Sequence, residues 1–554
     1  MRPHLPRVLL WGLVGLLGLN LLQASLTELL YDEAYYWYYA QQPAWGYFDH
    51  PPMVAWMIWA GSQLFSGELG VRLLSTFMGI GTLCLLWSLI DAPGKHKRAG
   101  ALLLWFLSIV LLQAYGFLAL PDTPLLFFTA LFLWVYRKFL QDPGPLQALF
   151  LGLAMAGLMY SKYHAALVIL FTLASNPGLL RNRWAWMALA VSLTAYAPHL
   201  GWLYQQDFVT VRYHLFERPN QPYNFAKFTA GYFLNLIALF GLTFPWVYAA
   251  LYRHRGTDRF QKALQYMAWG ILIFFFVSSF QRRIQTQWLI ACCIPLALIV
   301  GQQLAKQPAW GKWFLRAAIA NLVILFWLRL GLAYEPLFPV HFEAHGNRAW
   351  VERLLKTADG AEVVFENSYR QASMYSFYSG RPSFSMNNDH YRKNQYSIDD
   401  SEAYMQGRRV FYAPVVPREG PYWYLDDRGQ RKYGTFMDPF QSLRKLEAWV
   451  DQGDPLTLSG THDFRVRNPY AAAVAADSLQ YGLALLDPYK RIIRSIPVQP
   501  IEWEEGRLIQ PSDTLQFQFE MPKGVTDQAA YLRAVVRLPG LHWGLNGMPQ
   551  KLEP

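Results

Sequence analysis

The stretch YDEAYYWYYAQQPAWGYFDHPP, residues 31–52, determines how the first part of the chain is interpreted. It is polar and aromatic, and it contains neither Lys nor Arg. The run before it, residues 8–22, is almost wholly apolar, so we expect Asp32 immediately outside the end of a membrane helix. The stretch therefore predicts a loop at the membrane surface that carries acidic and aromatic side chains.

Apolar runs recur from the N-terminus to about residue 335 and predict a multi-span membrane protein. The candidate spans are about 5–24, 69–90, 99–118, 125–140, 146–160, 163–175, 184–204, 228–251, 263–280, 288–304 and 314–334. The apolar stretch 53–65 is short and follows two prolines, so we expect a helix lying in the membrane interface. The expected fold class is an α-helical polytopic membrane protein with about 11 transmembrane helices.

The net charge of +11 does not indicate nucleic-acid binding, because much of the positive charge falls in short loops between apolar runs. With the N-terminus in the cytoplasm, the inner loops carry more Lys and Arg than the outer loops. We therefore expect a multi-pass protein of the cytoplasmic (inner) membrane with a periplasmic or extracellular C-terminal region. The three cysteines, Cys84, Cys292 and Cys293, lie inside apolar runs and imply no disulfide framework.

The C-terminal part has the polarity of an ordinary extramembrane domain. Short apolar stretches at 361–365 and 408–414 flank a stretch at 368–380 that favours a helix. This alternation is typical of an α/β unit. Further on, TLQFQFEMP and YLRAVVRLP favour strands. We expect a transmembrane catalytic domain at 1–335 with a first outer loop at about 25–68, an extracytoplasmic α/β domain at 336–450 and a β-rich subdomain at 451–554.

The pair Asp32-Glu33 is the first candidate for chemistry. A carboxylate at the mouth of an apolar scaffold can act as a general base, because partial desolvation raises its pKa and an acceptor hydroxyl can reach it. The alternative is that both anions cap the N-terminus of an interfacial helix.

Asp122 stands in the turn LALPDTPLLFF, which also favours a helix start. If Asp122 lies near Asp32, the two carboxylates can bind a divalent metal or divide the acid and base roles.

Other polar residues fall on the same expected outer face. Asp49-His50 and His214 offer oxygen and nitrogen ligands to a metal such as zinc, although a structural role for the histidines is the simpler interpretation. The cations Lys162, Arg218, Arg282 and Arg283 run against the positive-inside tendency and favour an anionic partner such as lipid phosphate. Snorkelling to lipid headgroups is the alternative for each of these cations.

The motifs DEAYYW and GYFDHPP, followed by an interfacial apolar helix and GVRLLS, resemble those of a known superfamily. They are similar to bacterial members of the protein O-mannosyltransferase and lipid A aminoarabinose transferase superfamily, the GT-C integral membrane glycosyltransferases. The likeness continues in PDTPLLFF, GLMYSKYHAALVIL, YHLFER and RRIQTQWLIACCIPLAL, and so spans about residues 25–300.

This resemblance implies transfer of a sugar, with inversion, from a polyprenyl-phosphate donor to an acceptor outside the membrane. Asp32 would be the base and Asp122 the second acidic residue. His50 stands where the aminoarabinose transferases have a phosphate-binding lysine, and histidine is a weaker cation at neutral pH. Lys162 and Arg218 would contact the donor phosphate, whereas Asp49 and His214 match positions linked to a metal.

The implied partners are a polyprenyl-phosphate sugar, membrane lipids and an acceptor that is lipid A, another glycan, a lipid or a protein hydroxyl. A divalent metal, whether zinc, magnesium or manganese, stays open as a cofactor. Two other classes compete with the transferase. A transporter or lipid flippase would show ionisable residues at mid-membrane and an internal repeat, and neither is evident. A non-catalytic membrane assembly protein with an outer recognition domain would not need Asp32.

Overall fold

A computed structural model describes residues 5–306, 311–338, 340–415, 419–451, 459–522 and 529–552. The chain divides into two compact units. Unit 1 comprises residues 1–207 and 223–345, and unit 2 comprises residues 208–222 and 346–554. The loop 208–222 therefore belongs to the unit formed by the C-terminal part of the chain, although helices of unit 1 precede and follow it.

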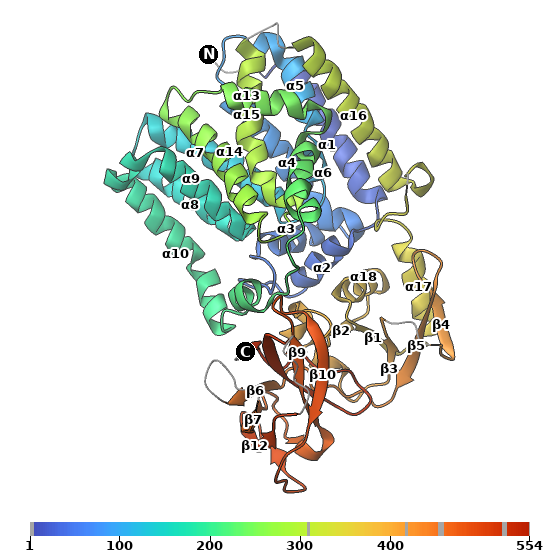
Figure 1. The fold of residues 1–554 in the computed structure, drawn as a ribbon. Helices are drawn as coiled ribbons and strands as arrows, with labels where there is room; N and C mark the ends of the chain where they lie inside the picture. The colour runs from blue at the N-terminus through green and yellow to red at the C-terminus, as the bar shows by residue number, and fades with distance from the viewer. Residues whose placement is uncertain are drawn as a thin grey trace. The chain divides into compact units, whose positions relative to one another are not determined.

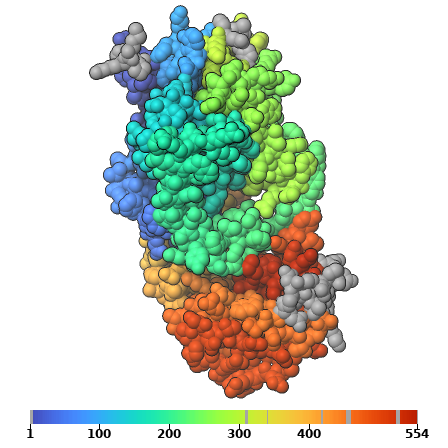
Figure 2. All heavy atoms as spheres, turned by 90° about the vertical axis from the view of Figure 1, so that its left-hand side faces the viewer, coloured from blue at the N-terminus to red at the C-terminus, as the bar shows by residue number. Residues whose placement is uncertain are grey.

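Unit 1 is helical throughout the residues that the structure describes (Figure 1). Its α-helices are α1 (Arg7–Leu26), α2 (Tyr31–Ala40), α3 (Met53–Ser62), α4 (Gly67–Leu89), α5 (Ala99–Ser108), α6 (Val110–Ala114), α7 (Asp122–Gln141), α8 (Pro145–Ser161), α9 (Ala166–Ser175), α10 (Arg183–Gln205), α12 (Gly231–Phe240), α13 (Phe244–Arg253), α14 (Arg259–Ser278), α15 (Cys293–Lys306) and α16 (Gly311–Ala333). Short turns of other helix types include η2 (Tyr163–Ala165), η5 (Ala226–Ala230), η7 (Thr286–Cys292) and η9 (Glu335–Leu337). Helices α7 to α10 lie on the side of unit 1 that faces the viewer in Figure 2.

Seven helical segments among the described residues are long and apolar enough to cross a membrane. The apolar helices α3, α8 and α9 are shorter, so the predicted number of 11 spans is not confirmed. The predicted class is confirmed: the chain is a polytopic, α-helical membrane protein with a sheet-rich C-terminal region.

The centre of unit 1 is α15, which is apolar on nearly all sides. A helix without a polar face must be covered on every side, and most of α15 is buried accordingly. The indole of Trp105 in α5 donates a hydrogen bond to the Ala297 carbonyl of α15, 3.1 Å away. Cys292 and Cys293 are buried free thiols beside this core, and Cys84 is an exposed free thiol.

Unit 2 begins with the predicted α/β arrangement. Strand β1 (Glu362–Glu366) pairs in parallel with β2 (Ser383–Met386) and β3 (Val410–Ala413), and the sheet order is β2-β1-β3-β5-β4. Its other strands are β4 (Tyr422–Leu425) and β5 (Arg431–Met437), and the helices are α17 (Asn347–Thr357), α18 (Tyr369–Ser379) and α19 (Ser401–Met405).

The remainder of unit 2 is built from antiparallel strands around a second apolar core. They are β6 (Glu447–Asp451), β7 (Thr461–Arg467), β8 (Val474–Ala475), β9 (Gln480–Leu486), β10 (Ile492–Val498), β11 (Leu508–Ile509), β12 (Thr514–Glu520), β13 (Tyr531–Arg537) and β14 (Gln550–Lys551). In β12 burial alternates residue by residue, as expected for a strand with one face on a core. The two stretches predicted as strands, TLQFQFEMP and YLRAVVRLP, form β12 and β13.

Segment 208–222 contributes α11 (Val209–Arg212) and η4 (Tyr213–Glu217) to unit 2. The backbone N–H of Asn220 donates to the Tyr489 carbonyl, 2.9 Å away. Glu217 forms an ion pair with Lys393 at 3.6 Å. These contacts explain why a loop that the sequence places between two spans clusters with residues far along the chain.

Candidate active site

Helix α2 carries the acidic pair in its first turn. Asp32 is half-buried, whereas Glu33 is fully buried. A Glu33 carboxylate oxygen accepts the backbone N–H of Leu30 at 3.1 Å, which satisfies one of the donors that an α-helix leaves unpaired at its start. The capping interpretation therefore applies to Glu33, and it leaves Asp32 as the member of the pair that is accessible for chemistry.

Glu33 also forms a buried ion pair with Arg72 of α4. The Nε and Nη2 atoms of Arg72 donate to the two carboxylate oxygens at 2.8 and 2.5 Å. The remaining donors of Arg72 reach the carbonyls of Ala24, Thr27 and Glu28, at 3.2, 2.5 and 2.9 Å. Since this ion pair holds the end of α1 and the starts of α2 and α4 together, the geometry favours a positioning role for Glu33.

Asp122 and Lys162, which the sequence proposes separately, lie in contact. The Lys162 Nζ donates to Asp122 Oδ1 at 2.7 Å, and each side chain is only 6% exposed. Asp122 begins α7 after Pro121, and Lys162 directly follows the last residue of α8. Two tightly packed helices thus bring a buried acid and a buried cation to the same end of the bundle.

The start of α2 is tied to the segment that precedes α7. Glu33 accepts the backbone N–H of Ala119 at 2.8 Å. The Thr123 hydroxyl fixes the turn by hydrogen bonds to the Tyr115 and Leu118 carbonyls. The candidate base and the candidate second acid therefore belong to one connected region.

The cluster Asp49-His50 folds against α2. Asp49 is 8% exposed, and it accepts hydrogen bonds from the hydroxyls of Tyr35 at 3.1 Å and Tyr39 at 3.4 Å. The His50 ring meets the edge of Tyr36 at a centroid distance of 5.6 Å. Because Tyr35 and Tyr36 are themselves buried, these rings support the loop.

His199 of α10 is a buried polar residue that the sequence interpretation did not single out. Its Nδ1 lies 2.7 Å from the Trp45 carbonyl and its Nε2 lies 3.1 Å from the Tyr163 hydroxyl. Because a carbonyl can only accept, Nδ1–H donates to Trp45, and Nε2 shares a hydrogen bond with the Tyr163 hydroxyl. A histidine inside a predicted span is a sequence pattern that could have indicated this residue. Its contacts link Trp45 of the first loop to Tyr163, which follows Lys162.

The remaining candidate cations are distributed over both units. Arg282 and Arg283 lie in the bend between α14 and η7, and within the described part of the chain neither guanidinium forms a hydrogen bond or an ion pair. Arg218 is exposed in unit 2. His214 lies in unit 2 as well, so the structure does not place it relative to Asp49.

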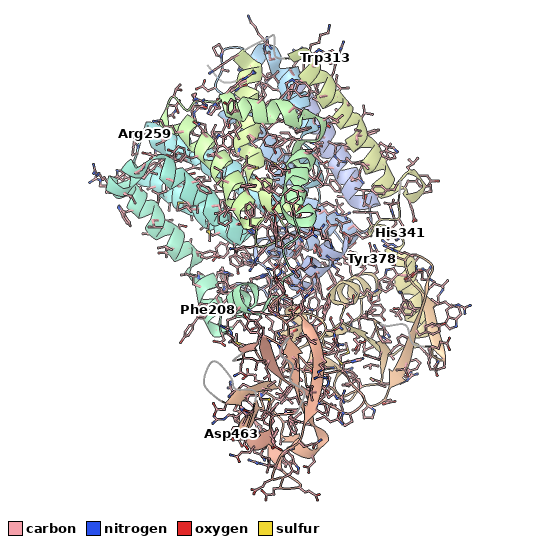
Figure 3. The ribbon with its side chains drawn as sticks, viewed as in Figure 1. Phe208, Arg259, Trp313, His341, Tyr378 and Asp463 are labelled. Carbon is pink, nitrogen blue, oxygen red and sulfur yellow. The ribbon has the colours of Figure 1, made fainter. Side chains whose placement is uncertain are left out.

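A group with metal-binding geometry follows α16. Glu335, His341 and His345 each offer a ligand atom, and these atoms lie within 4.8 Å of one another. The segment, with His341 labelled in Figure 3, is close to the end of α16. The carboxylate of Glu335 lies 2.9 Å from His341 Nδ1. The spacing His-x3-His in HFEAH is one that zinc sites use, but the sequence interpretation did not include it.

The surroundings of His345 fit a metal ligand. His345 is 5% exposed and its Nε2 lies 2.9 Å from the Gly331 carbonyl, while its Nδ1 is buried without a hydrogen-bond partner in the described residues. Metal-binding histidines commonly donate the second ring N–H to a carbonyl in this way. Two imidazoles and a carboxylate form a donor set suited to zinc.

The chain is similar in sequence to known glycosyltransferases over part of its length. Residues 49–202 match the family described as dolichyl-phosphate-mannose-protein mannosyltransferase. The lipid A galacturonosyltransferase RgtD of Rhizobium johnstonii is 25% identical over 336 residues, or 57% of this chain and 65% of that protein. The undecaprenyl phosphate-alpha-4-amino-4-deoxy-L-arabinose arabinosyl transferase of Shewanella sediminis is 26% identical over 321 residues, or 53% of this chain and 58% of that protein. The chain thus spans less than two thirds of either relative.

Two crystal structures of ArnT from Cupriavidus metallidurans are similar in fold. The apo structure aligns with a TM-score of 0.57 at 14% identity, covering 73% of this chain and 92% of that one. The structure bound to undecaprenyl phosphate aligns with a TM-score of 0.54 at 14% identity, covering 76% and 97%. The matches confirm the resemblance to the GT-C superfamily that the motifs of the first loop indicate.

Proposed function

We propose that this chain, whose fold is that of the GT-C membrane glycosyltransferases, transfers a sugar from a polyprenyl-phosphate donor to an acceptor hydroxyl. The reaction takes place on the outer face of the cytoplasmic membrane and inverts the anomeric centre. The names of the relatives support a lipid-linked donor and, among the possible acceptors, a glycolipid of the lipid A class. The observation that carries the proposal is the half-buried Asp32 within the region that also holds the buried Asp122–Lys162 pair.

In the proposed step, Asp32 accepts the proton of the acceptor hydroxyl. The acceptor oxygen then bonds to the anomeric carbon while the bond from that carbon to the phosphate oxygen breaks. Polyprenyl phosphate leaves as an anion that is already stable, so the protein chiefly has to supply cations around it. Glu33 contributes by fixing the first turn of α2, and Asp122 by holding Lys162 in place.

The cations of unit 1 proposed to face the phosphate are Lys162, Arg282, Arg283 and His50. Arg282 and Arg283 are the strongest candidates, because within the described residues no carboxylate neutralises them. The Lys162 ammonium already donates to Asp122, so this contact fixes the position of its positive charge. His50 contributes less charge at neutral pH than a lysine at the same place would.

A divalent metal is part of the proposal at one place, where Glu335, His341 and His345 form a group that the geometry supports. Zinc held by this group would fasten the segment after α16. The transfer step as written balances without a metal.

The proposal is tested with purified protein in lipid nanodiscs that contain lipid A and a panel of polyprenyl-phosphate sugars. Mass spectrometry follows the release of polyprenyl phosphate and the appearance of a glycosylated lipid. The Asp32→Asn variant is expected to lose at least about 99% of the transfer rate, since a positioned base contributes roughly 100-fold or more. Asp142→Asn, an exposed acid after the far end of α7, is the matched control and is expected to retain activity.

Near-normal turnover in Asp32→Asn would move the base elsewhere, with Asp122 as the next candidate. Absence of release from every donor by the wild type would favour the non-catalytic class. Movement of the lipid-linked sugar across a bilayer without any new glycoside would favour the transporter class.

A further inference from the structure

Unit 2 contains a cavity of about 200 Å³ that lies entirely within this unit. One wall is segment 208–222, which supplies Tyr213 and Glu217 from the YHLFER motif. The other walls come from residues 389–393, from the turn between β9 and β10, and from Arg533 of β13. The cavity therefore exists only because the loop between two helices of unit 1 is built into unit 2.

Arg533 is the most unusual residue of this cavity. It is only 6% exposed, and among the described residues its buried Nε has no hydrogen-bond partner. Burial lowers the pKa of Arg533, while the nearby carboxylates of Glu217 and Asp389 raise it. An arginine offers five N–H donors, and a buried charge without hydrogen bonds is unfavourable. Such a group is explained when a ligand supplies the missing acceptors.

The other cations around the cavity are already engaged to different degrees. Lys393 pairs with Glu217 at 3.6 Å, and Arg491 pairs with Asp487 at 2.6 Å. The Lys490 ammonium donates to the Phe216 carbonyl. Arg392 lies over the ring of Tyr369 at 4.8 Å and over that of Tyr213 at 5.9 Å.

The charge of the lining is positive, with Arg392, Lys393, Lys490, Arg491 and Arg533 opposed by Glu217 and Asp389. One of the two acids also has unused capacity. Asp389 Oδ2 accepts from the Ser495 hydroxyl at 2.6 Å, but its buried Oδ1 has no hydrogen-bond partner in the described residues and lies 3.8 Å from His390 Nε2. The cavity thus presents unused cationic donors next to an unused anionic acceptor.

We propose that this cavity binds a phosphorylated sugar, with the phosphate on Arg533 and a sugar hydroxyl or amine on Asp389. A bare anion would use the donors of Arg533 but not the Asp389 oxygen, whereas a sugar phosphate uses both. Tyr213 and Tyr391 add aromatic surface of the kind on which sugar rings pack. Resting on the proposed function, the source of this group is the phosphorylated headgroup of the acceptor glycolipid, which unit 2 would hold for transfer.

The first test measures binding of glucosamine 6-phosphate to the full-length protein in nanodiscs by isothermal titration calorimetry. Unphosphorylated glucosamine and inorganic phosphate are titrated alongside. We expect saturable binding of glucosamine 6-phosphate that is at least tenfold tighter than that of either fragment. Arg533→Met is expected to weaken this binding at least tenfold, and Arg533→Lys to weaken it less because the charge is kept.

Arg537→Met is the matched control, because Arg537 lies on the same strand, contacts Gln480 and Trp543, and does not line the cavity. Unchanged binding in Arg533→Met, or equal binding of glucosamine and glucosamine 6-phosphate, would overturn the proposal. Asp389→Asn is expected to reduce the preference for the sugar phosphate over inorganic phosphate. Retention of the full preference would remove Asp389 from the site.

The source of the phosphorylated sugar is tested by competition. Diphosphoryl lipid A in the nanodisc is expected to compete with glucosamine 6-phosphate, and failure to compete would overturn the headgroup assignment. The assay contains no donor and is repeated on Asp32→Asn. Binding without transfer from any donor would sink the proposed function and leave this site intact, whereas transfer without binding would sink this site and leave the function intact.

Discussion

Arg72 in unit 1 and Arg533 in unit 2 are both buried arginines, and the two are opposite in how they are bonded. Arg72 in unit 1 is 0% exposed and uses its Nε and both Nη atoms in hydrogen bonds to Glu33 and to three carbonyls. Arg533 in unit 2 is almost as deeply buried, and its Nε has no hydrogen-bond partner within the described residues.

The difference in hydrogen bonding distinguishes an arginine that stabilises the fold from an arginine that can bind a ligand. A buried cation whose donors are all satisfied by the protein fixes the backbone around it and has nothing left to offer a ligand. A buried cation with unused donors next to a cavity carries a desolvation penalty that an anionic ligand relieves. By this comparison, Glu33 and Arg72 hold α1, α2 and α4 together, and Arg533 is expected to bind another molecule.

The largest expected effect comes from breaking the satisfied pair. Arg72→Met leaves Glu33 charged and buried, so we expect the free energy of unfolding to fall by about 3–5 kcal/mol. Arg533→Met should change it by less than about 1 kcal/mol, or raise it, because an unpaired buried charge is removed. Chemical denaturation in detergent, followed by circular dichroism, measures both.

The double variant Glu33→Leu/Arg72→Met is the control for the ion pair. Replacing both partners by apolar groups should recover a large part of the loss. Equal losses for Arg72→Met and Arg533→Met would contradict the comparison between the two arginines.

The second-largest effect is expected for the buried ion pair of Lys162 with Asp122. The Lys162 ammonium pairs with Asp122, and it is expected to direct part of its charge towards the donor. We expect Lys162→Met to lower the transfer rate by about 100-fold. A double-mutant cycle with Asp122→Asn should show strong non-additivity in the rate, and simple additivity would mean that the two residues act separately.

His345 is a third buried polar group that lacks a hydrogen-bond partner in the described residues. Its unbonded ring nitrogen, Nδ1, can bind a metal cation, whereas Arg533 would bind an anion. Addition of zinc at about 100 times its dissociation constant should stabilise the protein by about 2.7 kcal/mol. His345→Ala should abolish both this stabilisation and the zinc found by elemental analysis. Equal zinc content in the wild type and in His345→Ala would show that the ion is held elsewhere.

The smallest effect is expected at the turn beside the Arg533 cavity. Burial raises the pKa of Asp487, but hydrogen bonds from Arg491 and from the Tyr489 backbone outweigh it, so the pKa lies below its usual value. A lowered carboxyl pKa stabilises the fold above the unfolded value and loses this contribution as the pH falls through the folded value. Asp487→Asn should cost about 0.5 kcal/mol at neutral pH and nothing in strong acid. Denaturation curves at pH 7 and below pH 3 give the comparison.

The sequence predicted the separate parts of the site better than their contacts. The pattern at 31–52 identified Asp32, Asp49 and the aromatic helix, because an apolar run that ends in acids is a local signal. The pairing of Asp122 with Lys162 joins residues 40 positions apart, and no local pattern specifies such a pair. The sequence does not distinguish Glu33 from Asp32. The ion-pair partner of Glu33, Arg72, lies inside an apolar run, and no local pattern indicates their contact.

Other features depend on tertiary structure that spacing does not reveal. Shorter helices such as α8 and α9 match the predicted runs 146–160 and 163–175 closely, yet their crossing of a membrane is not confirmed. The surroundings of His199 and His345 are set by the backbone carbonyls of Trp45 and Gly331. The sequence does not show that these carbonyls lie beside the two rings. The cavity beside Arg533 combines a loop near residue 215 with strands beyond residue 480, which only the fold brings together.

The placement of segment 208–222 in unit 2 has a consequence for synthesis of the protein. The carbonyl of Phe216 is met by the ammonium of Lys490, 274 positions later in the chain. At about 5–20 residues per second, this segment leaves the ribosome roughly 14–55 s before its partner does. Unit 2 therefore cannot mature from its own C-terminal residues alone: an early stretch, inserted between two helices of the bundle, has to be kept accessible until translation is nearly complete.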